Sequence, residues 1–438
     1  MSIEIITILM FGLMLLLLAS GLPIAFVLGG TSIVFGLFMW GPASMHIIIA
    51  NASNTMRSTV LVAIPLFVFM AYMLEKSGIA EELYEAMYRW LGSLKGGLAA
   101  GTVITCTIVA AMSGISSTGV LLMGIIGLPA MLSRGYDKKI ALGSIIAGGA
   151  LGPLIPPSVV LIVYALISGQ SVGKLFLGGV VPGILLSVLF ILYILIYALI
   201  NPTLAPALPK EERFTWKNKI YALKGIIFPF LLVLGVLGSI FFGLATPTEA
   251  AAVGAAGSIL SALLHGKLNW QTLKYVSYQS LKTVSMVMWV IFAAGCFATI
   301  YQGLGASDLI ENLLKDLSVN KYIILLIIQV TWVILGMLMD ALSILMITAP
   351  IFIPVSDFLG FDPLWFGILY AVNTEMGYLT PPFGVNLIIM KGIGHKNISM
   401  VDIYRSVWPF VILQAIGLLL IIVFPALATW LPDLVFNR

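Results

Sequence analysis

The chain has 438 residues, of which 61% are hydrophobic and only 9% are charged, and its formal net charge at pH 7 is +4. Soluble proteins carry about 25% charged residues, so this composition excludes a soluble globular protein and predicts an all-α polytopic membrane protein. The basic residues are better explained as topology signals in a lipid bilayer than as a nucleic-acid surface. Cys106 and Cys296 lie in apolar segments without metal-ligand spacing and are interpreted as buried thiols.

Uninterrupted apolar segments of the first half are long enough to span a bilayer. They are residues 3–20, 23–40, 60–75 and 174–200. The first of them has no basic region before it, so it is predicted to be a spanning helix and not a signal peptide. Two charged amphipathic segments, 78–93 and 305–317, are too short to span and are expected to lie along the membrane interface.

Two further apolar stretches of the first half are interrupted. Residues 96–132 contain the polar sequence A-M-S-G-I-S-S-T at 111–118, which predicts a helical hairpin with its tip near Ser113–Thr118. Residues 140–167 would cross a membrane, but glycines and three prolines in G-P-L-I-P-P-S (152–158) prevent a continuous helix. We therefore expect a helix that is broken at its centre.

The second half of the chain repeats the first. G-P-L-I-P-P at 152–157 resembles G-Y-L-T-P-P at 377–382, and the same offset of 225 residues places Pro129 on Pro354. The matches predict two repeats joined by a polar linker. Repeat 1 covers 1–203, the linker covers 204–224, and repeat 2 covers 225–438 with a hairpin at 321–356 and a broken helix at 363–392.

Lys and Arg residues indicate how the repeats lie in the membrane, because they concentrate in cytoplasmic loops. If the N-terminus is outside and each hairpin enters and leaves on one side, all but five of the 22 Lys and Arg residues are cytoplasmic. The linker is then cytoplasmic, both termini are periplasmic, and the two repeats have inverted topology. Re-entrant hairpins and discontinuous helices in inverted repeats are typical of secondary carriers with a binding site at the bilayer midplane.

The helix breaks are predicted to bind cations. Each proline lacks an N–H group and leaves the carbonyl four residues earlier without its partner, which frees the carbonyls of Gly149, Gly152, Pro153, Gly377 and Tyr378. Such oxygens, with hydroxyls from the hairpin tips, suit a small hard cation, so we expect two Na⁺ sites. Their candidate ligands are Ser113, Ser116, Gly149, Gly152 and Ile155 in repeat 1, and Gly336, Gly377 and Thr380 in repeat 2. The alternative is that the prolines only kink packing helices.

Other polar residues near the tips and breaks are candidates for substrate binding. They are Ser117, Thr118, Asp340, Ser343, Asn373, Thr374 and Asn386. Ionisable residues at membrane depth are rare and commonly functional, although a structural hydrogen bond is an alternative for Asp340, and Glu375 is equally open. Glu249 is interpreted as a helix cap. The sequence contains no nucleophile–base or metal constellation that would predict an enzyme.

Four motifs carry a family resemblance that covers essentially the whole chain. They are M-S-G-I-S-S-T-G-V (112–120), G-P-L-I-P-P-S (152–158), A-T-P-T-E-A-A-A-V-G (245–254) and E-M-G-Y-L-T-P-P-F-G-V-N (375–386). With them the chain resembles the large membrane subunit (M, DctM-type) of TRAP transporters, the tripartite ATP-independent periplasmic type, within the ion-transporter superfamily. The A-T-P-T-E-A-A-A-V-G segment is the most specific of the four, since Pro-Pro breaks also occur in related carriers.

The resemblance implies a large permease subunit in the bacterial inner membrane that is driven by Na⁺ and works by an elevator motion. Such subunits import a carboxylate-containing solute, for example a C4-dicarboxylate, sialic acid or a similar organic acid. They act with a small four-helix membrane subunit (Q) and a periplasmic substrate-binding protein (P). A stand-alone Na⁺/dicarboxylate or citrate carrier of the same superfamily is the alternative; a channel is less compatible with paired hairpins.

Overall fold

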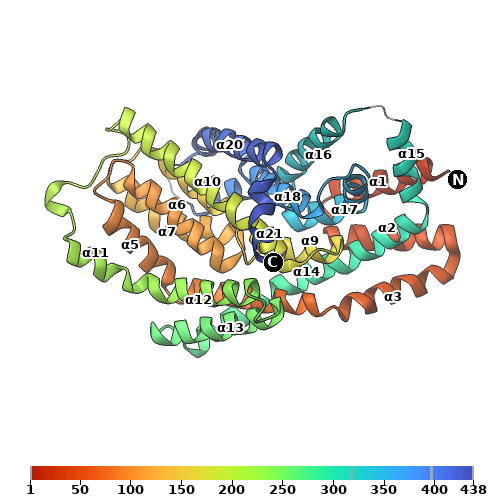
Figure 1. The fold of residues 1–438 in the computed structure, drawn as a ribbon, viewed down its shortest axis with the longest axis horizontal. Helices are drawn as coiled ribbons and strands as arrows, with labels where there is room; N and C mark the ends of the chain where they lie inside the picture. Colours follow the sequence, from red (N-terminus) through yellow and green to blue (C-terminus); the bar gives the residue numbers. More distant parts are fainter. Residues whose placement is uncertain (1, 317–318, 395–397, 437–438) are drawn as a thin grey trace.

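The computed structural model describes residues 2–316, 319–394 and 398–436, and within these ranges every regular element is a helix (Figure 1). The first half contains α1 (Ile3–Ala19), α2 (Ile24–Trp40), α3 (Ser44–Met56), α4 (Ala63–Lys76), α5 (Ile79–Leu91), α6 (Gly97–Ser113), α7 (Ser116–Ser133), α8 (Lys138–Ala150), α9 (Val159–Ser168) and α10 (Val172–Ile200).

The remaining helices form the linker and the second half. They are α11 (Trp216–Ala222), α12 (Lys224–Phe241), α13 (Pro247–Leu264), α14 (Trp270–Gly303), α15 (Ala306–Asp316), α16 (Lys321–Gly336), α17 (Ala341–Phe358), α18 (Pro363–Leu379), α19 (Val385–Gly392), α20 (Met400–Val423) and α21 (Ala426–Phe436). Among the described residues, eight helical segments are long and apolar enough to cross a membrane. The chain is thus an all-helical polytopic membrane protein.

Helix α3 was not predicted from the sequence. Its segment is rich in Asn, Ser and Thr, which gives it the composition of a loop. In the structure this polar helix packs against α2 and α14, where Asn51 donates from Nδ2 to the Cys296 sulfur at 3.7 Å. Gly295 leaves room for this side chain, since a Cβ there would lie 2.7 Å from Asn51 Nδ2. Tertiary packing therefore stabilises a helix that local composition disfavours.

Helix α5 connects two packed helices through one apolar face. It follows Gly78, whose φ of +84° allows the sharp turn out of α4. Ile79, Leu83 and Tyr84 are buried on the side that packs against α6, whereas Glu81 and Glu82 are exposed on the other side. The segment is therefore the amphipathic helix that the sequence predicts.

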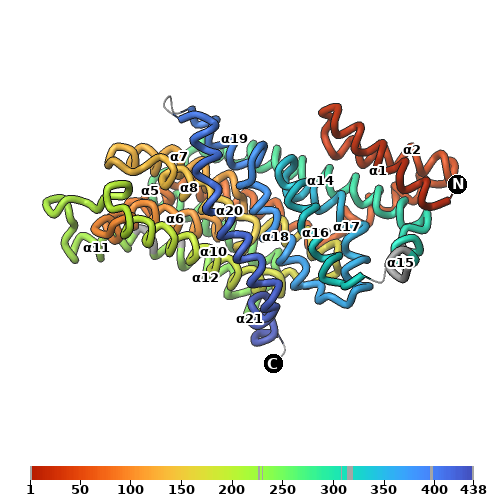
Figure 2. The backbone as a smooth tube through the Cα atoms, turned by 90° about the horizontal axis from the view of Figure 1, so that it is seen from above, coloured from red at the N-terminus to blue at the C-terminus, as the bar shows by residue number. Residues whose placement is uncertain are grey.

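The two interrupted stretches of each half pack on one another. Helices α6 and α7 form a hairpin against α8, and α16 and α17 form a second hairpin against α18. Residues 151–158 separate α8 from α9, and residues 380–384 separate α18 from α19; both segments contain a cis Pro–Pro bond. Figure 2 shows α16, α17 and α18 side by side, with α6, α7 and α8 grouped in the other half of the molecule.

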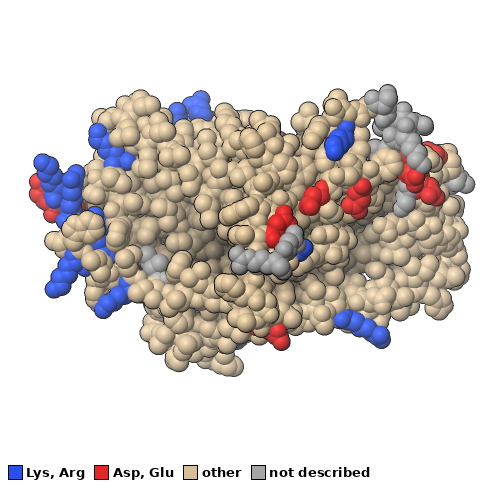
Figure 3. Space-filling model, viewed as in Figure 1, with Lys and Arg blue, Asp and Glu red and all other residues tan. Residues whose placement is uncertain are grey.

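Charged side chains are distributed unevenly over the surface. In Figure 3, most Lys and Arg side chains on the visible face gather at the end that carries α5, α6 and α11 in Figure 1, whereas Asp and Glu lie mainly over the other half. Much of the remaining surface is uncharged, and large hydrophobic side chains such as Phe26, Phe38 and Phe242 are highly exposed. Such a surface fits a lipid environment with two differently charged ends.

Candidate functional site

Both hairpin tips and both helix breaks meet around one cavity of about 290 Å³. One wall comes from the interrupted segments: Gly114, Ile115, Ser116, Ser117, Pro153, Val159, Val160, Asp340, Ala341, Leu342, Tyr378 and Val385. The other wall comes from α4 and α14: Val68, Tyr72, Thr283, Met286 and Val287. A hydrogen bond of 2.8 Å between the Tyr72 and Thr283 hydroxyls joins these two helices.

Four helix N-termini converge on this cavity. Ser116, Val159, Ala341 and Val385 are the first residues of α7, α9, α17 and α19, and all four line it. The first turn of a helix has N–H groups without intrahelical partners and a partial positive charge. Among the described residues that line the cavity, none is Lys, Arg or His. Helix ends are therefore the main source of positive potential in the cavity.

The first hairpin tip packs tightly on the first break. Gly114 has a φ of +61°, and a Cβ on it would lie 2.1 Å from the Pro157 carbonyl oxygen. A Cβ on Gly152 would lie 2.6 Å from the Ser116 nitrogen. These approaches are closer than real Cβ contacts, so glycine is required on both sides of this interface. Ser113 hydrogen-bonds locally within the tip, where its hydroxyl accepts from the Ile115 N–H at 3.4 Å.

The second hairpin packs on the second break through a pair of glycines. A Cβ on Gly336 would lie 2.9 Å from Gly377 Cα, and a Cβ on Gly377 would lie 2.5 Å from Gly336 Cα. The backbones of α16 and α18 therefore touch directly at their C-terminal ends, where carbonyl groups accumulate and the partial charge is negative. Thr380, which follows α18, donates its hydroxyl hydrogen bond to the Met376 carbonyl at 2.6 Å.

The carbonyls predicted to be free divide into two groups. Within the described part of the chain, the carbonyls of Gly149, Gly152 and Tyr378 have no hydrogen-bond donor. The prediction was wrong for two others. Pro153 accepts from the Ser158 hydroxyl, and Gly377 accepts from the Thr380 N–H at 3.1 Å. Local turns replaced the lost helical bonds there, which a rule based on proline positions alone does not capture.

Several predicted substrate residues lie away from the cavity. Thr374 donates to the Tyr370 and Ala371 carbonyls of its own helix, and Asn373 donates to Gln329 on α16 at 2.8 Å. Thr118 and Ser343 are also buried outside the cavity lining. Ile155, a predicted Na⁺ ligand, packs its side chain against Gly183 of α10. These side chains support the hairpins and breaks instead of facing the cavity.

The acidic candidates have three different environments. Asp340 lines the cavity and also caps α17, because it accepts from the Ser343 N–H at 3.1 Å. Glu375 is fully buried and accepts from the Leu154 N–H in the first break at 3.1 Å. Glu249 forms a capping box with Thr246 at the start of α13, which confirms its interpretation as a cap.

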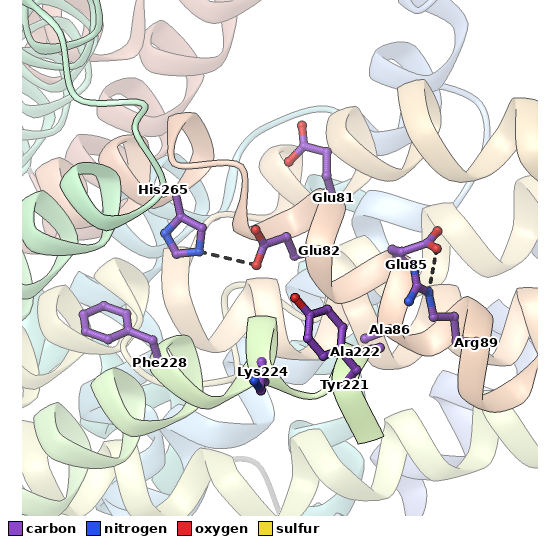
Figure 4. A pocket seen from close by; sticks show the side chains of 10 residues that line it. All are labelled: Glu81, Glu82, Glu85, Ala86, Arg89, Tyr221, Ala222, Lys224, Phe228 and His265. Carbon is purple, nitrogen blue, oxygen red and sulfur yellow. Dashed lines mark hydrogen bonds and ion pairs between the residues drawn. The ribbon is translucent and has the colours of Figure 1, made fainter. Parts of the chain in front are cut away.

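A second, larger cavity of about 550 Å³ lies away from both breaks (Figure 4). It is open to the surface between α5, the α11–α12 corner and His265. Its charged side chains form surface pairs, with 3.3 Å between His265 Nε2 and Glu82 Oε2 and 2.8 Å between Arg89 Nε and Glu85 Oε1. Because none of the hairpin tips or breaks reaches it, we assign the functional site to the cavity between the tips.

The geometry agrees with comparisons to known proteins. The family model of the tripartite ATP-independent periplasmic transporter DctM component matches residues 11–427. The chain belongs to this family. This DctM-family chain is 32% identical to the C4-dicarboxylate TRAP transporter large permease protein DctM of Vibrio cholerae, over all of this chain and 99% of that protein. It is therefore a multi-pass membrane protein of transport and not an enzyme.

Two further similarities concern assembly and fold. The DctM-family chain is 31% identical to the isethionate TRAP transporter permease protein DctMQ of Oleidesulfovibrio alaskensis, over 95% of this chain and 65% of that protein. It also resembles the YdaH transporter of Alcanivorax borkumensis, with a TM-score of 0.67 at 15% identity, over 93% of this chain and 96% of the other. The second similarity shows the fold alone.

Sequence reasoning missed the cavity wall on α4 and α14. Tyr72, Thr283 and Met286 lie in ordinary apolar or amphipathic helices without a proline, a charge or a motif that would mark them. Tyr378, which belongs to the second break, was named only for its carbonyl, yet its hydroxyl accepts from the Ala341 N–H at 2.7 Å. The hydroxyl thereby satisfies a donor at the N-terminus of α17.

Proposed function

We propose that the chain is the large permease subunit of a Na⁺-coupled TRAP transporter and imports a carboxylate-containing solute such as a C4-dicarboxylate or a similar organic acid. One observation carries the proposal: the two hairpin tips and two breaks bring four helix N-termini and four helix C-termini to one small cavity. N-termini favour an anion and C-termini favour a cation, so one set of segments serves both a carboxylate and its coupling ions.

The Na⁺ part rests on oxygen atoms without donors. Carbonyls of Gly149 and Gly152 in the first break, and of Tyr378 in the second, have spare lone pairs among the described residues. Na⁺ requires oxygen ligands, and neutral carbonyls replace its water shell without placing further charge in the membrane. Sites near Ser113–Ser116 and Gly336–Thr380 would accommodate one ion per repeat.

The carboxylate part rests on backbone donors at the cavity. The N-terminal turns of α7 and α17 present N–H groups beside Ser117, whose side chain is half-exposed at the tip. Bound Na⁺ supplies additional positive charge. This arrangement explains how a carboxylate is held at membrane depth although the described lining residues include no Lys, Arg or His.

An elevator motion fits the way in which the cavity is divided. Its tips and breaks belong to hairpins that pack on their own broken helices, whereas its opposite wall belongs to α4 and α14. We propose that the first group moves past the second, with α5 and α15 as the connecting arms. The charge distribution in Figure 3 supports inverted repeats with both termini outside, because basic residues favour the cytoplasmic side.

The proposed partners are a small membrane subunit and a periplasmic binding protein. The name DctMQ joins two components, and the chain aligns with 65% of that relative, which leaves room for a second one. The alternative, a stand-alone dicarboxylate or citrate carrier, is tested by adding or omitting the partners. Proteoliposomes that contain both membrane subunits should take up solute only with the binding protein and an inward Na⁺ gradient. Uptake driven by a proton gradient alone would refute Na⁺ coupling.

A further inference from the structure

Two buried side chains of the second repeat bind directly to the site of the first. Glu375 in α18 is completely inaccessible to solvent. Its Oε1 accepts from the Leu154 N–H at 3.1 Å, and its Oε2 accepts from Gln414 Nε2 on α20 at 3.2 Å. The carboxyl group thus joins the first break to two helices of the second repeat.

The position of Leu154 gives this bond its importance. Leu154 lies between Gly152 and Ile155, the candidate Na⁺ ligands of the first break, while Glu375 lies two residues before Gly377 and five before Thr380. A single hydrogen bond therefore connects the peptide at the centre of one proposed ion site to the helix that ends in the other. Break segments lack regular helical bonds, so their conformation depends on such individual contacts.

Asn386 provides a second connection. It is the second residue of α19, directly after the second break, and it is fully buried. Its Oδ1 accepts from the Ser116 hydroxyl at the first hairpin tip at 2.9 Å, and its Nδ2 donates to the Ile146 carbonyl of α8 at 3.5 Å. It therefore ties the first tip and the helix before the first break to the helix after the second.

At the repeat offset of 225 residues, Glu375 corresponds to Ala150 and Asn386 corresponds to Leu161. Neither of these has a side chain that can form the reciprocal bond. The two connections are thus specific additions to the second repeat and not consequences of duplication.

We propose that Glu375 and Asn386 are positioning residues that couple the two breaks, so that Na⁺ bound at one break orders the other and raises its Na⁺ affinity. The proposal rests on the proposed function, because it requires an ion at each break. Physically, the first ion fixes the Gly152–Ile155 peptides, and the Leu154–Glu375 and Ser116–Asn386 bonds transmit this order to Gly377 and Thr380. The second ion then meets a site whose conformational entropy has already been reduced.

The test measures solute uptake against Na⁺ concentration in proteoliposomes that contain the complete transporter. The wild-type protein should give a Hill coefficient of about two, the limit for two sites. Glu375→Leu and Asn386→Leu, which remove the acceptors, should each lower it toward about one. Glu375→Gln should retain cooperativity, because the amide oxygen still accepts from the Leu154 N–H.

Asn373→Leu is the matched control. Asn373 is equally buried in α18, but it bonds to Gln329 within its own repeat, so its loss should change the half-saturating Na⁺ concentration without changing the Hill coefficient. The two couplers act through separate bonds, so Asn386→Leu tests the proposal even if Glu375→Leu does not fold. Unchanged cooperativity in folded Leu variants, or its loss in Glu375→Gln, would overturn the coupling. Uptake by the wild-type protein without any Na⁺ dependence would instead overturn the proposed function.

Discussion

The contact between Gly152 and the first hairpin tip gives a quantitative test of the cavity. In Gly152→Ala, the new Cβ would lie 2.6 Å from the Ser116 nitrogen and 2.7 Å from the Ile115 carbonyl carbon. Ordinary contact begins near 3.4 Å, so the tip and the break must separate by about 0.8 Å. The neighbouring atoms are backbone, and Ser116 is also held by Asn386, so no flexible side-chain end can yield.

Overpacking of this kind costs about 1–3 kcal/mol. If the separation falls on the Na⁺ site, the half-saturating Na⁺ concentration for uptake should rise by about 5- to 150-fold. Gly392→Ala is the control, because this glycine belongs to the other broken helix and a Cβ there meets nothing within 4 Å. A folded Gly152→Ala protein whose Na⁺ dependence matches that of Gly392→Ala would refute the assignment of the first break as an ion site.

Three further predictions concern the other repeat and its caps. Gly377→Ala should impair Na⁺-dependent uptake more than Gly336→Ala, since its Cβ would come within 2.5 Å of the facing backbone instead of 2.9 Å; equal effects would argue against this contact. Asp340→Asn should keep the α17 cap but raise the half-saturating Na⁺ concentration, whereas Asp340→Ala should also lose about 1 kcal/mol of stability in thermal unfolding. Thr246→Ala should lower stability by about 1 kcal/mol without altering Na⁺ dependence, and a change in uptake cooperativity would contradict a purely structural cap.

The breaks and hairpins were the parts most accessible to sequence reasoning. Pro156, Pro157 and their counterparts Pro381 and Pro382 remove helical N–H groups wherever they occur, so the interruptions follow from covalent structure alone. The matching helix ends at Ala150 and Leu379 lie where those prolines require them. The offset between the copies also indicated which segments belong together.

The hydrogen-bond partners at the site were less accessible. Whether Gly377 keeps a free carbonyl depends on whether Thr380 folds back to reach it, and that is decided by tertiary packing. The same holds for Asn373 and Thr374, which are polar and adjacent to a break but point toward α16 and along their own helix. Sequence proximity to a break therefore identified the helices of the site more reliably than the individual side chains that face the cavity.

The wall on α4 and α14 escaped prediction because it departs from the repeat. At the offset of 225 residues, the single helix α14 corresponds to α3 and α4 together, and the interruption between them at 57–62 corresponds to 282–287. Those residues are continuous helix in repeat 2, and Thr283, Met286 and Val287 line the cavity there. Duplication therefore accounts for the tips and breaks, which occur twice, whereas the Tyr72–Thr283 wall joins non-equivalent positions of the two copies. A surface past which the tips move must fit two different hairpins in turn, and residues that differ between the copies are the means by which one cavity can do so.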